Sequence, residues 1–254
     1  MLFVIDVGNT NIVLGVYSGE TLLKSWRVRT ERNTTEDEFN ILVANLFSDS
    51  GFMLDEIEKT LVSCVVPPMV TILDSFCRKY LGHSPRWVNA KSYAKMPILI
   101  TNPSELGADR IVNAVAAYHK YQTSLIIIDF GTATTFDAIS QKGEYLGGAI
   151  SPGVGISSEA LFLKASKLPR IEIFEPPEHV IGKDTGQSLK AGIIYGYAGL
   201  VDGIVKRMKT EMGSKPKIVA TGGLATLIRH VSETIETIEP DLTLEGLRII
   251  NSSQ

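Results

Sequence analysis

The sequence predicts an α/β protein that is built by duplication of one unit. The apolar runs Leu2–Val7 and 12–17 flank a short polar turn at residues 8–11, a pattern typical of a tight hairpin. Residues 125–139 repeat this pattern, with a strand that ends in Asp129-Phe-Gly131, then a turn and a second strand. One copy in each half of the chain indicates a duplicated domain.

Composition and charge exclude several classes of protein. The chain has 254 residues, of which 44% are hydrophobic and 21% charged, enough apolar material for a sizeable core. Its formal net charge is −3 and its basic residues are scattered, so we expect no nucleic-acid partner. Asp6 interrupts the first apolar run and no run is long enough to span a bilayer, which predicts a cytoplasmic protein without a membrane partner. Cys64 and Cys77 fit no metal or disulfide spacing, and we expect buried free thiols.

The elements after the first hairpin have the order of an α/β unit. Alternation predicts a third strand at residues 21–30, and Thr35 with Glu38 forms a capping box at the start of a helix. Gly51 ends that helix. There follow a buried strand at 61–66 that Pro67 and Pro68 break, a helix at 69–81 and a short strand at 86–89. The order βββαβαβ predicts a sheet that is covered on both faces.

The turn of the first hairpin has the chemistry of a phosphate site. Asp6 lies at the end of the first strand, Gly8 permits close backbone approach, and Asn9, Thr10 and Asn11 bring small hydrogen-bonding side chains. Such donors hold phosphate oxygens, while the carboxylate faces a metal ion. An Asx-turn in an ordinary hairpin has the same residues, so the first copy alone leaves both interpretations open.

A second candidate site follows an irregular connection. Residues 90–105 include Pro97 and Pro103, and we therefore expect two domains, at 1–105 and 106–254. Next comes Gly107-Ala-Asp109-Arg110 at the start of a helix. Asp109 is a plausible N-cap. The helix dipole opposes a cation in the first turn, so we expect an anion that compensates the charge of Arg110. An arginine fork suits a ligand carboxylate, and Asp109 beside it is placed to take a proton from a hydroxyl of the same ligand.

The second half repeats three strands and adds longer helices. We expect strands at 125–129, 132–140 and 143–150, a glycine-rich turn into a helix, and a Pro-rich surface loop at 169–183 that could form a flap. A helix at 188–212 carries a stripe of small residues, which fits either internal packing or a second copy of the chain. A strand from residue 217 ends in a Gly-Gly turn, and a closing helix occupies 239–251.

Four stretches of the chain, in order, resemble one protein family. The two hairpins resemble the phosphate-1 and phosphate-2 loops of the acetate and sugar kinase, Hsp70 and actin superfamily. Asn102-Pro-x-Glu-x-Gly-Ala-Asp-Arg-Ile-Val-Asn113 resembles the substrate motif of type III pantothenate kinases, and Gly182-Lys-Asp184-Thr185 is similar to their Gly-Lys-Asn-Thr. The resemblance implies a duplicated actin-like, ribonuclease H-like α/β fold, with two βββαβαβ lobes and the active-site cleft between them. It also implies a cytoplasmic homodimer that phosphorylates pantothenate to 4'-phosphopantothenate, the first step of coenzyme A biosynthesis.

The resemblance also assigns roles to individual residues. It implies ATP as phosphoryl donor, Mg²⁺, and K⁺ or NH₄⁺ as a monovalent cation at Asp129. The catalytic base is Asp109, and pantothenate is held by Gly107, Ala108, Asp109, Arg110 and Thr185. The nucleotide is bound by Asp6, Val7, Gly8, Asn9, Thr10, Asn11, Ile12, Val13 and Thr132.

One departure and two alternatives remain. Many family members carry an aromatic residue in the pantothenate pocket where this chain has Ile100, and the nearest tyrosine is Tyr93. A kinase for another small hydroxy acid fits the same residues. A non-catalytic nucleotide-binding accessory factor, or an actin-like polymer, needs no base beside a carboxylate grip, and the Asp109-Arg110 pair argues against it.

Overall fold

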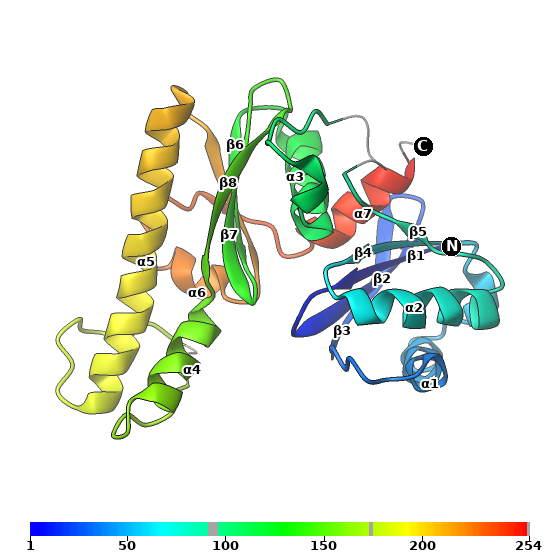
Figure 1. Cartoon of the computed structure of the whole chain (residues 1–254), viewed down its shortest axis with the longest axis horizontal. Coiled ribbons are helices and arrows are strands. Elements are labelled where there is room, and N and C mark those ends of the chain that lie inside the picture. Colours follow the sequence, from blue (N-terminus) through cyan, green and yellow to red (C-terminus); the bar gives the residue numbers. More distant parts are fainter. Residues whose placement is uncertain (91–95, 173–174, 253–254) are drawn as a thin grey trace. The chain divides into compact units, whose positions relative to one another are not determined.

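The computed structural model describes residues 1–90, 96–172 and 175–252, and the chain forms two compact units (Figure 1). The first unit comprises Met1–Pro97, Thr101–Ala116 and Asp241–Gln254, and the second comprises Ile98–Ile100 and Ala117–Pro240. This division differs from the expected boundary after residue 105. The start of the helix that carries the Asp-Arg motif belongs to the first unit, and so does the last helix of the described chain, which packs with the first sheet.

The first unit contains a five-stranded sheet with the order β3-β2-β1-β4-β5. Its strands are β1 (Leu2–Val7), β2 (Asn11–Ser18), β3 (Thr21–Arg29), β4 (Lys59–Cys64) and β5 (Arg86–Trp87). The first three strands are antiparallel, and β4 and β5 extend the sheet in parallel. In the parallel pair of β1 with β4, Asp6 is in register with Ser63.

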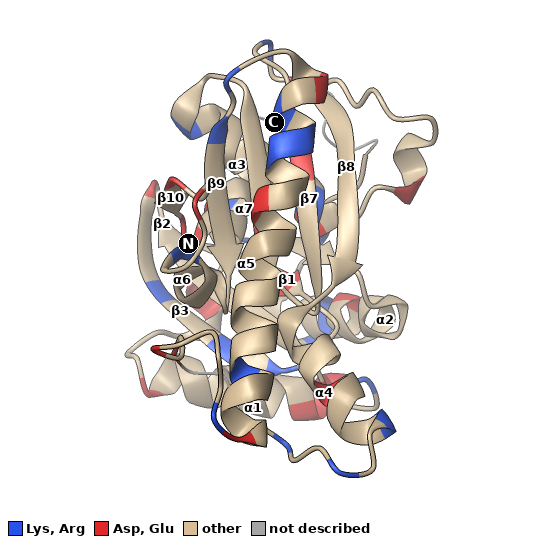
Figure 2. Cartoon of the chain, turned by 90° about the vertical axis from the view of Figure 1, so that its left-hand side faces the viewer, with Lys and Arg blue, Asp and Glu red and all other residues tan. Residues whose placement is uncertain are grey.

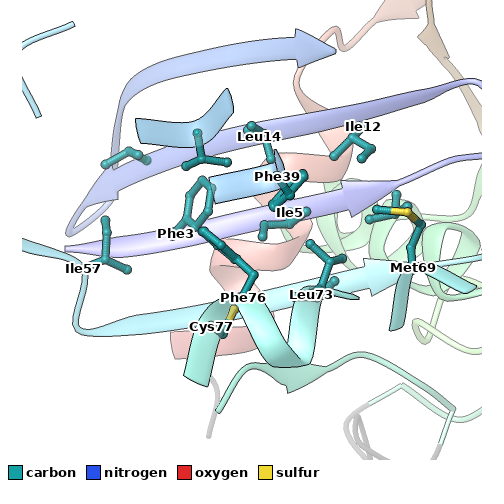
Figure 3. Packing of buried hydrophobic residues seen from close by; sticks show 14 of the residues in the cluster. Phe3, Ile5, Ile12, Leu14, Phe39, Ile57, Met69, Leu73, Phe76 and Cys77 are labelled. Atoms are coloured by element: carbon teal, nitrogen blue, oxygen red, sulfur yellow. The ribbon is translucent and has the colours of Figure 1, made fainter. Parts of the chain in front are cut away.

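One face of this sheet is covered by α1 (Glu36–Ser48) and α2 (Pro67–Phe76). Phe3 and Ile5 of β1 pack there with Phe39 and Phe76 of the helices (Figure 3). Thr35 and Glu38 form the predicted capping box of α1. Strand β4 ends before the two prolines, as expected. The helix begins two residues earlier than predicted, because Pro67 is the first residue of α2, where a missing N–H costs nothing.

The other face of the first sheet receives α7 (Leu242–Ser252), from the C-terminal end of the chain. A Cβ on Gly15 of β2 would lie 3.1 Å from Leu244 Cδ1, so this glycine gives the helix close access to the sheet. Arg248 is buried and paired with Glu245, with a closest distance of 2.5 Å. The predicted closing helix at 239–251 is therefore confirmed, with its start three residues later.

The second unit repeats the same strand order, as β8-β7-β6-β9-β10. Its strands are β6 (Leu125–Phe130), β7 (Ala133–Ile139), β8 (Tyr145–Pro152), β9 (Lys217–Gly222) and β10 (Thr237–Ile238). Helices α4 (Val154–Lys164) and α5 (Thr185–Met212) pack on one face, and α6 (Ala225–Arg229) follows β9. The duplication inferred from the two hairpins is confirmed by this matching topology.

Helix α3 (Ala108–Tyr121) contributes its first nine residues to the first unit and the rest to the second. The predicted long helix begins at Thr185, three residues earlier than expected, and Asp184 is its N-cap through a 2.8 Å bond from Gln187 N. Cys64 is half-buried, Cys77 is buried, and both are free thiols. Among the described residues, no helix is long and apolar enough to cross a membrane.

Candidate active site

The first hairpin turn closes tightly at the end of β1. Gly8 N donates to Asn11 O over 3.0 Å, and a Cβ on Gly8 would lie 3.2 Å from that oxygen. Asn9 and Thr10, at the tip, are exposed, while the side chains of Val7 and Ile12 belong to the core. Of the predicted nucleotide residues, Val7 and Ile12 can therefore meet a ligand only through their backbone.

Two residues beyond β3 hold this turn, and neither was predicted. Thr30 is 9% exposed, and its hydroxyl donates to Gly8 O over 2.6 Å. Its N–H donates to Thr10 O over 3.0 Å, and Arg32 donates to Asn9 Oδ1 over 3.0 Å. These contacts join residues about twenty positions apart, so no local pattern in the sequence predicts them.

The Asp-Arg motif lies in the first turn of α3. Asp109 Oδ1 accepts from Arg110 N over 2.8 Å, and a Cβ on Gly107 would lie only 2.5 Å from Asp109 Oδ1. Only glycine at position 107 leaves room for the carboxylate to fold back over the chain. Asp109 is not the N-cap: α3 begins at Ala108, and the carbonyl of Gly107 already accepts from Ile111 N over 3.3 Å.

The end of β4 lies beside both motifs of the first unit. Val65 N donates to Val7 O over 3.1 Å, which continues the pairing of β4 with β1 past Asp6. Val65 Cγ1 is also 3.8 Å from the place where a Cβ on Gly107 would be. One residue thus borders the strand end that carries Asp6 and the helix start that carries Asp109.

Burial raises the pKa of Asp109, and its bond from Arg110 N and the charge of that arginine oppose the rise. A carboxylate that is harder to keep ionised is a stronger proton acceptor once it is ionised. This is the electrostatic character expected of a general base, and titratable groups perturbed in this way cluster at functional sites.

The second hairpin has a related construction. Gly131 N donates to Ala133 O and Gly153 N to Thr132 O, each over 3.1 Å. The half-buried Asp129 lies at the corresponding strand end, in register with Thr221 of β9. A Cβ on Gly222 would lie 2.7 Å from Asp129 Oδ1, so the carboxylate rests directly against glycine backbone.

The predicted residues thus fall into two sets. Asp6 to Val13 and Gly107 to Arg110 belong to the first unit, and Asp129, Thr132 and Thr185 belong to the second. Thr185 is exposed at the first position of α5, and Ile100 Cγ2 lies 3.7 Å from the place of a Cβ on Gly147 in β8. Tyr93 lies outside the described residues.

No group of three His, Cys, Asp or Glu side chains is gathered into a metal site in the part of the chain that the structure describes. This donor set still fits Mg²⁺, which keeps several waters and needs only one or two carboxylates beside substrate phosphates. Asp6, next to the turn, is the carboxylate so placed. Asp129 offers a hard oxygen ligand to a monovalent cation.

Comparison with known proteins gives consistent results. The family model described as type III pantothenate kinase matches residues 2–207. A type III pantothenate kinase from Desulfatibacillum aliphaticivorans is 64% identical over 250 residues, which cover 98% of this chain and 97% of the relative.

Solved structures agree at the level of the fold. Component A of the (R)-2-hydroxyglutaryl-CoA dehydratase of Acidaminococcus fermentans superposes with a TM-score of 0.58 at 15% identity, over 98% of this chain and 95% of that one. The polyphosphate/ATP-glucomannokinase of Arthrobacter sp. strain KM gives 0.52 at 15% identity, over 100% and 99%. At 15% identity these likenesses support the fold alone, an α/β chain with two five-stranded sheets of matching strand order.

Proposed function

Since this chain belongs to the type III pantothenate kinase family, we infer that it phosphorylates pantothenate with ATP, the first step of coenzyme A biosynthesis. The observation that carries the mechanism is the placement of Asp109 and Arg110 in the first turn of α3, beside the end of β4. Membership of this family also supports a cytoplasmic location, where ATP is available.

In the proposed reaction, the primary hydroxyl of pantothenate attacks the γ-phosphorus of ATP. A new P–O bond forms, the bond to ADP breaks, and the hydroxyl proton passes to the Asp109 carboxylate. Arg110 holds the carboxylate of pantothenate by paired hydrogen bonds, and Gly107, Ala108 and Thr185 complete the binding site. Phosphoryl transfer depends on positioning and charge neutralisation more than on covalent chemistry, which suits a site of this composition.

The hairpin turns are proposed to hold the nucleotide. In the first unit, Asn9, Thr10, Asn11 and the backbone on either side of them bind phosphate oxygens, and in the second unit Thr132 does so. Asp6 would hold the shell of Mg²⁺, which neutralises phosphate charge when bound. The family resemblance supports Asp129 as the ligand of K⁺ or NH₄⁺, and its carboxylate lies against the backbone of Gly222, where no larger residue would fit.

A homodimer built on α5 is the proposed assembly. Gly192, Gly196 and Gly199 are exposed at positions four and three apart. Apart from the adjoining residues and the nearby backbone of α5 itself, no described atom lies within 4 Å of the place where a Cβ on any of them would be. Internal packing therefore does not account for these three glycines within the described chain. The middle of α5 is also uncharged (Figure 2). Neighbouring α4 exposes Ile156, Leu161, Phe162 and Leu163, so a second copy has apolar surface to cover.

Release of ADP from ATP, with and without pantothenate, tests the function. We expect turnover that requires pantothenate and is weak with pantothenol, whose hydroxymethyl group replaces the carboxylate that Arg110 binds. Equal rates with the two compounds would contradict the role of Arg110. ADP release that no hydroxy acid stimulates would instead favour the non-catalytic alternative.

A further inference from the structure

The first hairpin turn is held by contacts that its own hairpin does not supply. Its tip is exposed, yet the carbonyls of Gly8 and Thr10 are both bonded to Thr30, a buried residue that directly follows β3. The two distances are 2.6 and 3.0 Å. A single residue thus ties down one carbonyl on each side of Asn9.

The second unit has a matching contact at the corresponding position. Gly153 directly follows β8, the third strand of that unit, and its N–H donates to Thr132 O over 3.1 Å. Thr132 precedes β7 as Thr10 precedes β2. A Cβ on Gly153 would lie 2.3 Å from Thr132 O and 2.7 Å from Gly131 O, so in this unit the turn is packed directly on the glycine.

We propose that Thr30 is a positioning residue for nucleotide binding, which holds the first turn in the conformation that receives phosphate oxygens. This inference rests on the proposed function, because it takes the turn as the phosphate site. If a turn samples several conformations, a ligand that binds one of them loses affinity in proportion to the time spent in the others. Thr30 removes that loss in advance through its hydroxyl and its N–H. In the second unit, the backbone of Gly153 does the same without a side chain.

The test compares two buried threonines of the first unit. Thr30→Val keeps the shape and the backbone bond but removes the hydroxyl, and Thr30→Ser restores the hydroxyl. Thr60→Val is the matched control. Thr60 lies on β4 with 2% exposure, and its hydroxyl bonds to His83 Nε2 over 2.9 Å. Thr60 pairs in register with Phe3 of β1, away from the turn. The measurements are the Kd for ADP by calorimetry, the KM for ATP and for pantothenate, and a thermal melt.

We expect Thr30→Val to weaken ADP binding and raise the KM for ATP by about three- to tenfold, the effect of one net hydrogen bond. The KM for pantothenate should stay within about twofold, and Thr30→Ser should bind ADP almost as the natural protein does. Thr60→Val should lose thermal stability without a change in nucleotide binding.

Equal ADP affinity in Thr30→Val and Thr60→Val would overturn the proposal. So would failure of both Thr30→Val and Thr30→Ala to fold while Thr60→Val folds, because Thr30 would then serve the fold alone. ADP binding is measured directly and does not depend on turnover. If the natural protein binds ADP but does not act on pantothenate, the proposed function is refuted, while the ADP affinities of the variants still test the role of Thr30.

Discussion

Replacing Asp109 with asparagine should abolish most activity and leave the fold intact. Removing a general base costs about 10²–10⁴ in rate, equivalent to about 3–5 kcal/mol of transition-state stabilisation. The structural cost is far smaller. Loss of a carboxylate from the first turn of α3 forfeits about 0.3–1 kcal/mol of interaction with the helix dipole, and relief from burying a charge offsets it. The melting temperature should therefore change by no more than about 4 °C.

The pH dependence gives the same variant a second readout. Because burial raises the pKa of Asp109, the folded state binds its proton more tightly than the unfolded state. The natural protein therefore loses stability, relative to Asp109→Asn, as pH rises from the ordinary aspartate range through the raised pKa. Its kcat should fall as pH drops through that same range, since the base is then protonated.

The assay is steady-state kinetics and thermal melts across pH 4–8, with Arg110→Ala as the contrast. Arg110→Ala should chiefly raise the KM for pantothenate, by about 2–5 kcal/mol of lost binding, while Asp109→Asn leaves ground-state binding little changed. If Asp109→Asn keeps its turnover but melts well below the natural protein, the carboxylate serves the helix and the catalytic assignment is wrong.

Four further predictions concern other parts of the molecule. Asp6→Asn should lower turnover by at least about a hundredfold without unfolding, as a Mg²⁺ titration and a melt would show; normal Mg²⁺ dependence would refute its role. Rates should be higher in K⁺ or NH₄⁺ than in Na⁺, and Asp129→Asn should remove the difference; equal rates in all three salts would exclude a cation site there. Gly199→Glu should convert a dimer to a monomer in light scattering, whereas a natural protein that is already monomeric at micromolar concentration would contradict the assembly. Gly153→Ala should lower the free energy of unfolding by about 1–3 kcal/mol in denaturant titrations, because its Cβ meets Thr132 O at 2.3 Å; an unchanged midpoint would show that the turn yields freely.

Local sequence signals predicted those parts of the fold that depend on local chemistry. Alternation and turn residues located both hairpins, and the Thr35–Glu38 capping box located the start of α1. The two-residue strand β10 was missed. The domain boundary differed because the place of α7 depends on packing with β1 and β2, from which it is separated by most of the chain.

The candidate site shows the same limit. Glycines and carboxylates at strand ends are visible in the sequence, since their chemistry needs those residue types. The sequence left Asp109 open as a helix cap, and the structure assigns that place to Gly107, because α3 begins at Ala108 and the carbonyl of Gly107 accepts from Ile111 N. No sequence pattern identified Thr30 as a residue that holds the first turn, because its bond to Gly8 joins the end of β3 to the end of β1.

The return of α7 to the first sheet has a consequence for synthesis of the chain on the ribosome. Strand β1 belongs to the same compact unit as α7, which is made far later. Leu244 can reach Gly15 only after α7 has emerged from the exit tunnel. Until then one face of the first sheet lacks its covering helix, and the nascent chain must pass through that exposed state. Loss of α7 would therefore damage the unit that carries Asp6 and Asp109.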